Sequence, residues 1–299
     1  MSDLQASDLR GSYVALITPF DEKGNINEKE LERIIEFQIE NGTAGIVPVG
    51  TTGESPTLTW EEHKLMIKLT VEIVNKRVSV IAGTGSNNTL EAIEATEYAQ
   101  KVGADGVLIV APYYNKPTQR GIYEHYKKIA EAVDIGIIIY NIPGRTGINI
   151  TPETIEKLAE IKNIIGLKAA CGDLNQMSDV IVRCGDKITL LSGDDTLTLP
   201  VLSIGGKGVI SVLANIVPNK MAKMIDLFLE GNISEAIEIH KELFKLGRAM
   251  FIETNPIPIK KAMEILGWKV GKPRLPLVEL SKENEIYLRN ILKEMGLIQ

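Results

Sequence analysis

Eight short apolar runs recur along the first three quarters of the chain, and each ends at or close to residues that favour turns. Several of them, such as IGIIIYN and GVLIVAP, are apolar almost throughout instead of alternating with polar residues. Strands of this kind are covered on both faces, which is typical of a parallel sheet flanked by helices. The predicted strands are Tyr13–Pro19, Gly45–Gly50, Val78–Gly83, Gly106–Pro112, Ile135–Asn141, Ile164–Ala170, Ile188–Gly193 and Gly208–Leu213.

Amphipathic segments with helical spacing lie between these runs, and several have recognisable starts. Asn27 precedes one such segment, Thr59 and Glu62 form a capping box, and Thr151 places a cap before the first-turn proline Pro152. Strand and helix alternate at roughly 25–35 residues per unit, which predicts an α/β fold of the (β/α)8 TIM-barrel type. An open doubly wound sheet is the structural alternative, although its phosphate fingerprint GxGxxG is absent.

The strand signals stop before the last quarter of the chain, where only helical patterns remain. We therefore expect a catalytic barrel over residues 1–231 and a C-terminal helical domain, a three-helix extension, over residues 232–299. The three predicted helices are Asn232–Gly247, Pro256–Leu266 and Ser281–Met295.

Composition excludes several classes of protein. The chain has 299 residues, 44% hydrophobic and 24% charged, which argues against disorder and coiled coil. A formal net charge of −6 argues against nucleic acid or an anionic membrane as a partner. No apolar run is long enough to span a bilayer, and the first ten residues are a short polar arm without signal-peptide character. Two cysteines, Cys171 and Cys184, predict no disulfide scaffold and favour a reducing cytoplasm.

In a TIM barrel the side chains that meet substrate lie at the carboxyl ends of strands and in the loops that follow them. At these positions the chain presents hydroxyls, one lysine and one arginine. The three histidines His63, His125 and His240 fall on predicted helices, and neither HxH nor HExxH occurs, so a histidine-bound metal is not expected. The candidates at this end of the barrel are Thr51, Thr52, Tyr113, Tyr114, Tyr140, Arg145, Lys168, Asp194, Asp195 and Ile210.

Lys168 is the most informative candidate because it lies within the otherwise apolar run Ile164–Ala170. Enclosing an ammonium group in an apolar interior is costly, so burial lowers a lysine pKa from about 10.4 toward neutrality. A neutral amine is a nucleophile that can form a Schiff base with a carbonyl substrate. The alternative is that Lys168 marks the end of its strand and extends its amine into solvent.

Tyr140 ends the preceding predicted strand in an equally apolar run. Schiff-base chemistry needs a group that moves protons, and a phenol beside the amine does so without adding a second fixed charge. The alternative is a core tyrosine whose hydroxyl is satisfied by the backbone.

Two places are candidates for binding carboxylate groups. Thr51 and Thr52 lie in a glycine-flanked turn whose backbone N–H groups can surround an anion, and Arg145 lies in a loop where its guanidinium can grip a carboxylate. Each has a simpler alternative, a tight turn in the first case and a surface charge in the second. The pair Asp194-Asp195 is interpreted as capping the helix that follows it, not as a cation site.

The order and spacing of several motifs resemble the dihydrodipicolinate synthase family of pyruvate-dependent class I aldolases. The resemblance covers essentially the whole chain, and separate motifs at family spacing are far more specific than any single pattern. They are TPF at Thr18, GTTGES at Gly50, APYYNKP at Ala111, YNIPGRT at Tyr140, GLK at Gly166, LSGDD at Leu191, GVISV at Gly208, ETNPIPIK at Glu253 and KPRLPL at Lys272.

The resemblance implies a lyase that condenses pyruvate with L-aspartate-4-semialdehyde to give 4-hydroxy-tetrahydrodipicolinate, the first committed step of lysine biosynthesis through diaminopimelate. It implies neither a metal nor an organic cofactor. Lys168 would form the Schiff base with pyruvate, and Tyr140 would donate and accept the proton. A hydroxyl relay would run from Tyr140 through Thr51 to Tyr114.

The same resemblance implies substrate-binding residues and an assembly. Thr52 and the Ile210 backbone would hold pyruvate, and Arg145 would bind the carboxylate of the semialdehyde. In the family the residue matching Tyr114 reaches across from a neighbouring subunit, so we expect a homo-oligomer, commonly a tetramer built as a dimer of dimers. Lysine-sensitive members have an inhibitor site at the dimer interface, and the matching residues here are Ser55, His63, Asn87, Glu91 and Tyr113, with Trp60 where some sensitive members have a histidine.

Two positions depart from the family pattern. Ala169 stands where an acidic residue is common and Cys171 where a threonine is common, and because both flank Lys168 they could alter the pKa of its amine. Two other functions stay open: a pyruvate-dependent aldolase acting on a sugar acid, and a catalytically inactive barrel kept as an oligomeric binding or regulatory protein. The sugar-acid enzymes usually lack both the paired tyrosines and the arginine of YNIPGRT, and this chain has both.

Overall fold

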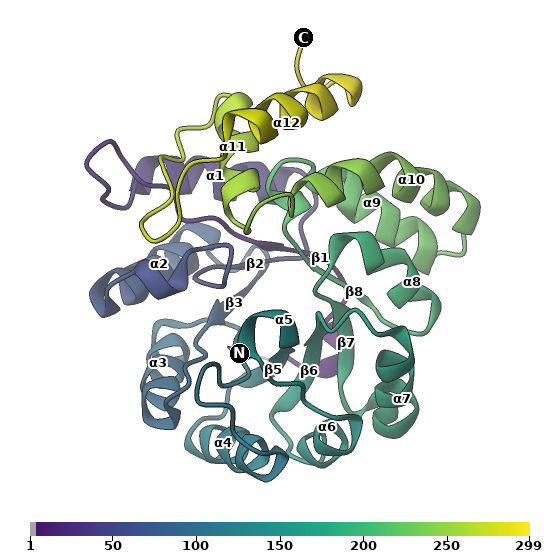
Figure 1. The fold of residues 1–299 in the computed structure, drawn as a ribbon. Helices are drawn as coiled ribbons and strands as arrows, with labels where there is room; N and C mark the ends of the chain where they lie inside the picture. The colour runs from purple at the N-terminus through teal and green to yellow at the C-terminus, as the bar shows by residue number, and fades with distance from the viewer. Residues whose placement is uncertain (1–3) are drawn as a thin grey trace.

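The computed structural model describes residues 4–299 and shows a closed barrel of eight parallel strands (Figure 1). Strands that follow one another in the sequence are neighbours, and β1 closes the barrel against β8. The predicted (β/α)8 barrel is confirmed, and the open doubly wound sheet was the wrong alternative. The strands are β1 (Gly11–Ala15), β2 (Gly45–Val47), β3 (Ser79–Gly83), β4 (Gly106–Val110), β5 (Gly136–Asn141), β6 (Ile164–Ala169), β7 (Thr189–Ser192) and β8 (Gly208–Ser211).

The strands overlap the predicted runs, but most of them end earlier. The run that begins at Gly45 is a strand only as far as Val47, because Val49 has a left-handed φ of 50° and the chain turns there. β1 ends at Ala15, although Leu16 and Ile17 beyond it are fully buried. Apolar residues in buried loops therefore extended the predicted strands, since hydrophobicity reports burial and not pairing.

Helices cover the outside of the barrel (Figure 1). Two predicted starts are confirmed: the Asn27 side chain accepts a backbone N–H of the first turn, and Thr59 and Glu62 form the reciprocal capping box. At the third start Pro152 takes the first turn, but the Thr151 side chain makes no capping hydrogen bond. The helices are α1 (Glu28–Glu40), α2 (Trp60–Val74), α3 (Thr89–Val102), α4 (Gln119–Ala132), α5 (Pro143–Thr146), α6 (Pro152–Leu158), α7 (Leu174–Cys184), α8 (Thr198–Ser203) and α9 (Pro218–Leu229).

The core has two layers, one on each side of the strands. Val47 and Leu108 belong to the cluster inside the barrel, whereas Ile46 and Val107 belong to the larger cluster that contains the buried faces of the helices. Because successive side chains of a strand point to opposite faces, an entirely apolar strand contributes to both layers. Burying this surface stabilises the fold by roughly 25 cal/mol for each Å² removed from water.

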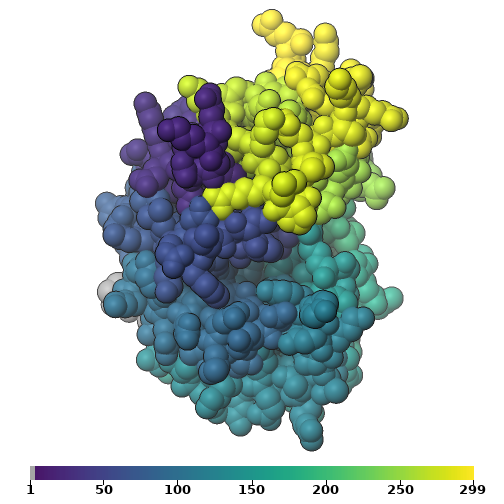
Figure 2. All heavy atoms as spheres, turned by 60° about the vertical axis from the view of Figure 1, so that its left-hand side comes forward, coloured from purple at the N-terminus to yellow at the C-terminus, as the bar shows by residue number. Residues whose placement is uncertain are grey.

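Three further helices lie together along one side of the barrel, coloured green to yellow in Figure 1. The structure places α10 at Ile233–Ala249, α11 at Ile257–Ile265 and α12 at Lys282–Glu294, so the predicted C-terminal helices are confirmed. Figure 2 shows yellow C-terminal residues lying against purple residues near the start of the chain and against blue residues beyond β2. The extension thus packs through α10 on α9, the last helix of the barrel, while its C-terminal segment lies on the first units.

The N-terminal segment differs from the predicted polar arm. Residues 1–3 lie outside the described part of the chain, but Leu4 and Leu9 are buried. A Cβ added to Gly106 or to Gly136, at the amino ends of β4 and β5, would contact Leu4. The segment therefore packs against the end of the barrel opposite the active-site candidates, with its leucines inward.

Neither membrane-spanning helices nor disulfides are found in residues 4–299. No helix in this range is both long and apolar enough to cross a bilayer. Cys171 is partly buried and Cys184 is buried, and both are free thiols.

Candidate active site

Lys168 lies near the carboxyl end of β6, opposite Tyr140 on β5 and Leu191 on β7. Its side chain is enclosed, with 6% of the residue exposed, and the ammonium nitrogen Nζ is 4.2 Å from the centre of the Tyr140 ring. Burial lowers the pKa of the Lys168 amine to about 7; the Asp195 carboxylate opposes this shift and Arg145 adds to it. The structure thus places a partly neutral amine at the barrel mouth and does not extend it into solvent.

Tyr140 is also buried at the mouth. Burial raises the pKa of its phenol to about 12, against the lowering effect of the Arg145 charge and of a hydrogen bond with the Thr51 side chain. The phenol is therefore protonated at neutral pH and can donate a proton to a group bound beside Lys168. Its partner is a side-chain hydroxyl and not the backbone carbonyl expected of a core tyrosine, in contrast to Tyr126, whose hydroxyl donates to the Ile109 carbonyl.

The threonine turn and Arg145 are brought to the same place by a residue far away in the sequence. The side-chain amide of Asn255 donates to Thr52 Oγ1 at 3.0 Å, and its backbone carbonyl accepts from Arg145 Nη2 at 2.9 Å. Arg145 itself comes from the short helix α5 (Pro143–Thr146), which follows β5. Asn255 was not identified from the sequence, although it lies within the ETNPIPIK motif.

A cavity of about 350 Å³ opens at this end of the barrel, and a smaller one of about 40 Å³ adjoins it. Thr51, Tyr140 and Arg145 line both cavities, whereas Thr52 and Lys168 line only the smaller, deeper one. The space is thus bounded by a nucleophilic amine, a protonated phenol, two hydroxyls and a guanidinium. Such a set can bind a carboxylated carbonyl compound and hold it beside an amine.

The interpretation of Asp194-Asp195 as helix caps is correct for only one of the two residues. Asp194 accepts a hydrogen bond from the Thr196 N–H and caps the following turn. Asp195 is buried instead, and it accepts from the Ser211 hydroxyl and from the backbone N–H groups of Val212 and Leu213, each at 3.0 Å. It therefore holds the turn after β8, and its carboxylate acts on Lys168.

Burial raises the pKa of Asp195 to about 6, so above that pH its charge favours the protonated form of Lys168. The sequence did offer a signal for this role, because LSGDD follows strand seven at the mouth. Adjacent aspartates before a helix are common caps, however, and nothing in the local pattern separates the two carboxylates.

Two expected residues are not brought to the cavities. Tyr114 is 89% exposed, has a left-handed φ of 72° and lines neither cavity. Ile210 is buried on β8 in the cluster inside the barrel, and like Tyr114 it lines neither cavity. Within one chain, therefore, the expected hydroxyl relay runs from Tyr140 to Thr51 and does not reach Tyr114.

The residues matched to an inhibitor site lie at the outer part of the larger cavity. Its lining includes Ser55, Trp60, His63, Glu91 and Tyr113. The remaining residue, Asn87, donates through its side-chain amide to the Tyr113 carbonyl at 3.1 Å and so holds that loop.

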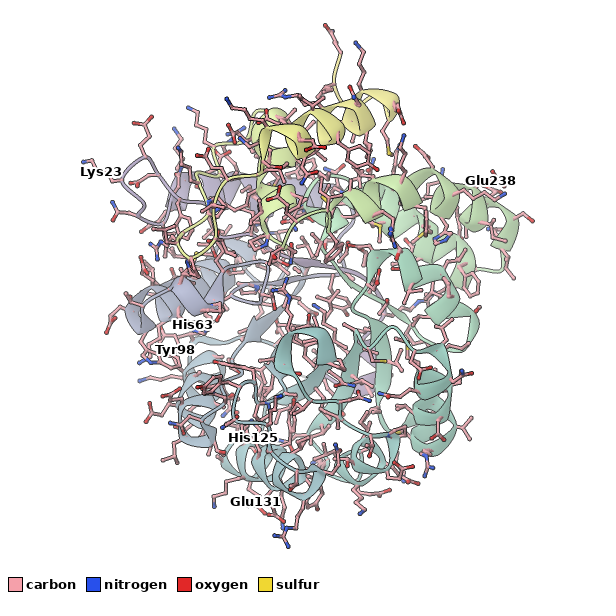
Figure 3. All side chains as sticks on the ribbon, in the orientation of Figure 1. Lys23, His63, Tyr98, His125, Glu131 and Glu238 are labelled. Carbon is pink, nitrogen blue, oxygen red and sulfur yellow. The ribbon has the colours of Figure 1, made fainter. Side chains whose placement is uncertain are left out.

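His63 and His125, both labelled in Figure 3, come from the outer helices α2 and α4. Burial lowers the pKa of each to about 4, so both are neutral near pH 7. In residues 4–299 no three His, Cys, Asp or Glu side chains are grouped as metal ligands would be.

The two departures from the family pattern lie away from the Lys168 amine. Ala169 is buried in the outer core cluster, on the face of β6 opposite to Lys168. Cys171 lies beyond the strand, where its Sγ is 3.8 Å from the Asp173 carbonyl oxygen. Burial raises the pKa of the Cys171 thiol, which keeps it protonated. The charges that act on the lysine are those of Asp195 and Arg145.

Comparisons with known proteins show which family the chain matches. The model of the dihydrodipicolinate synthetase family matches residues 8–295. A 4-hydroxy-tetrahydrodipicolinate synthase of Geotalea daltonii is 54% identical over 289 residues, which cover 97% of this chain and 99% of that protein.

Two solved structures are similar over nearly their whole length. The dihydrodipicolinate synthase of Aquifex aeolicus has a TM-score of 0.95 at 51% identity, covering 97% of this chain and 99% of the other. The enzyme of Cyanidioschyzon merolae, solved with lysine bound, has a TM-score of 0.95 at 44% identity, covering 97% and 99%. The barrel and the C-terminal extension are thus shared as one unit.

The lowered pKa of Lys168 predicts how its reactivity depends on pH. In reductive methylation followed by mass spectrometry, the labelling rate of Lys168 should rise about tenfold per pH unit below pH 7 and level off above about pH 8. Asp195→Asn removes a charge that favours the ammonium form, so the plateau should begin at lower pH. A lysine of ordinary pKa would instead gain reactivity up to about pH 10, and that result would contradict the assignment.

Proposed function

The chain belongs to the dihydrodipicolinate synthetase family and condenses pyruvate with L-aspartate-4-semialdehyde, and we propose that Lys168 carries this reaction as a Schiff base. The product is 4-hydroxy-tetrahydrodipicolinate, which enters lysine biosynthesis through diaminopimelate. Family membership and an identity of 54% to a synthase favour this lyase over a sugar-acid aldolase and over an inactive barrel.

The observation that supports the Schiff base is the buried Nζ of Lys168 at 4.2 Å from the Tyr140 ring. The neutral amine attacks the keto carbon of pyruvate, and the resulting hydroxyl leaves as water with a proton from Tyr140. Tyr140, now deprotonated, takes a methyl proton and turns the iminium into an enamine, whose carbon attacks the aldehyde. The alkoxide that forms takes this proton back from Tyr140. The amino group of the semialdehyde then attacks the iminium carbon and closes the ring, and its two protons pass to Tyr140 and to the amine of Lys168 as Lys168 leaves.

We assign the binding of the two substrate carboxylates to the Thr51-Thr52 turn and to Arg145. Thr52 holds pyruvate, and Arg145 binds the carboxylate of the semialdehyde. The Ile210 backbone, which the resemblance assigns to pyruvate, lines neither cavity and is left out of this assignment. The hydrogen bonds from Asn255 to Thr52 and from Arg145 to Asn255 support this assignment, because they fix the two carboxylate-binding groups relative to each other.

Reduction of the enzyme with borohydride tests the assignment directly. With pyruvate present, a reduced pyruvate adduct should appear on Lys168 and be absent in Lys168→Met, because only an iminium is trapped. Lys260 is an internal control, since it is equally buried but paired with Glu54. Tryptic mass spectrometry locates the modified residue. An adduct on another lysine, or none at saturating pyruvate, would contradict the proposal.

We propose that Tyr114 completes the relay in a partner subunit. In one chain it is 89% exposed and lines neither cavity, and Trp60 and Leu90 are also exposed large side chains. The loop that carries Tyr114 is held in place, because the Asn115 side chain donates to the Asn87 carbonyl at 2.9 Å. A homodimer that buries this surface, paired into a tetramer, fits these features and the family resemblance.

Mixing two inactive variants tests the shared site. Lys168→Met and Tyr114→Ala should each be strongly impaired as homo-oligomers. After co-refolding, random pairing into dimers should restore about one quarter of the wild-type activity, because one site of each mixed dimer holds both intact residues. If both residues acted within one chain, the mixture would show no gain over the separate variants.

We propose that the outer part of the larger cavity binds lysine as a feedback inhibitor. The Nδ1 of His63 is buried without a hydrogen-bond partner among the described residues, so it can accept from an ammonium group. Glu91 supplies a carboxylate and already accepts from the Ser86 hydroxyl at 2.7 Å. The lysine-bound structure of the Cyanidioschyzon merolae enzyme supports this choice of ligand.

Lysine titration of the condensation rate is the corresponding measurement. L-lysine should inhibit the enzyme, and Glu91→Gln should weaken the inhibition at least about tenfold, because a charged hydrogen bond to the ligand is lost. Inhibition is expressed relative to the uninhibited rate of each variant. A wild-type rate that does not change up to high lysine concentration would reject the inhibitor site.

We further propose a cytoplasmic location, which the two free thiols fit. We keep the division into a barrel over residues 1–231 and a helical extension over residues 232–299 as a description of the chain. The contacts of Asn255 mean that the extension contributes to the site and is not a separate functional unit.

A further inference from the structure

Four motifs of the sequence each carry a residue that has no part in the reaction described above, and the structure brings these residues to one point. The motifs are TPF near β1, GTTGES, ETNPIPIK and KPRLPL. Their residues Phe20, Glu54, Lys260 and Arg274 contact one another.

The centre of this cluster is a buried ion pair between Lys260 and Glu54. Lys260 Nζ is 2.7 Å from Glu54 Oε1, and the two side chains are only 1% and 0% exposed. Nζ also donates to the carbonyls of Thr18 at 3.2 Å and Lys272 at 3.4 Å. The second carboxylate oxygen of Glu54 accepts from the Arg274 N–H at 2.8 Å. Each proton of the ammonium and each oxygen of the carboxylate thus has a partner.

Two cations share the ring of Phe20. Lys260 Nζ is 4.3 Å and the Arg274 guanidinium carbon is 4.2 Å from its centre. Arg274 also donates to the Gly24 carbonyl at 2.7 Å and pairs with Glu62, so the segment after α11 is attached to the start of the barrel and to α2. The extension and the first two βα units are therefore connected through charged groups.

This cluster is continuous with the turn that carries Thr51 and Thr52. Glu54 is the residue after Gly53, and its N–H donates to the Thr51 carbonyl at 3.1 Å. Glu54 has a left-handed φ of 55°, which is unfavourable for a residue with a side chain and persists only where the surroundings hold it. The Thr18 hydroxyl donates to the Gly53 carbonyl at 2.6 Å and fixes the same end of the turn.

A buried ion pair is in general a weak source of stability. Desolvating two charges costs as much as their attraction returns, and apolar replacements of similar volume are often neutral. A role limited to stability would therefore leave the charges unexplained. Directional contacts from a charged group do, however, fix the place of a turn more closely than apolar packing would.

We propose that Glu54 and Lys260 are positioning residues for the Thr51-Thr52 turn, so that the C-terminal extension sets the geometry of the turn that binds pyruvate. Neither side chain lines the cavities, so both act through the turn and not on the substrate. The inference rests on the proposed function, in which this turn holds pyruvate. Asn255, on the same extension, adds a second contact through Thr52.

The decisive variant is Glu54→Gln/Lys260→Met, which removes both charges and leaves no unpaired ion. It should fold with a thermal midpoint close to that of the wild type, because a neutral pair of similar size replaces the ions. Its KM for pyruvate should nevertheless rise about tenfold while kcat falls by no more than about threefold, the pattern of weakened binding. Lys260→Met alone should have a lower thermal midpoint and a higher KM for pyruvate than the double variant, because it leaves Glu54 buried and unpaired.

Two readouts separate positioning from a general loss of structure. The pH dependence of adduct formation at saturating pyruvate should not move, because the charges acting on Lys168 are Asp195 and Arg145. Glu279→Gln is the matched control: it breaks the Lys272–Glu279 pair of the same segment, whose side chains are 76% and 47% exposed. Its KM and thermal midpoint should equal those of the wild type.

A double variant that is stable and has the wild-type KM for pyruvate would overturn the proposal and leave the pair with a structural role only. If the double variant does not fold, Glu54→Gln alone decides, measured well below its own thermal midpoint: an unchanged KM rejects positioning. Borohydride trapping on the wild type separates the two hypotheses. Absence of an adduct there rejects the proposed function, whereas a normal adduct with an unchanged KM in the variants rejects only this inference.

Discussion

Lys168 can act as a nucleophile near neutral pH only if water cannot solvate its ammonium form, and the closed barrel meets this condition. Strands β5 and β7 flank the lysine on β6, and the Tyr140 ring lies 4.2 Å from its nitrogen. Burial lowers the pKa of the amine to about 7, and the Asp195 carboxylate limits the shift. The amine is thus neutral enough to attack a carbonyl, while a charge remains nearby to compensate the iminium that we propose.

Buried charges are compensated at two places in the structure, at Asp195 and at Glu54, and the two places have different roles. Asp195 is hydrogen-bonded by Ser211 and by the backbone after β8, so its carboxylate is held rigidly while it acts on Lys168. Glu54 instead forms a direct ion pair with Lys260 and secures the threonine turn from behind. The Asp195 carboxylate raises the pKa of Lys168. The Glu54 carboxylate, through its ion pair with Lys260, holds the threonine turn.

Particular residues show how far the sequence could predict this site. Lys168 and Tyr140 were recognisable because a polar group at the end of an apolar strand is exceptional and a TIM barrel exposes strand ends at its mouth. Asp195 was misassigned as a cap, because its partners Ser211 and Val212 come from another strand end. Asn255 and Lys260 were missed, since Asn255 lies in the turn before α11 and Lys260 lies on that helix, and no local pattern shows which distant residue either side chain contacts.

The amino-acid sequence alone determined the eight strands, the helices between them and the order in which they close, because these depend on local periodicity and on the short reach of each connection. Only the tertiary structure decided which polar groups meet: Glu54 and Lys260 are 206 positions apart, and Thr52 and Asn255 are 203 apart. No local pattern encodes such pairs. They are chosen by the packing of the C-terminal extension on the barrel, which excludes water from both partners at once and leaves each buried polar group only the neighbour that the fold provides.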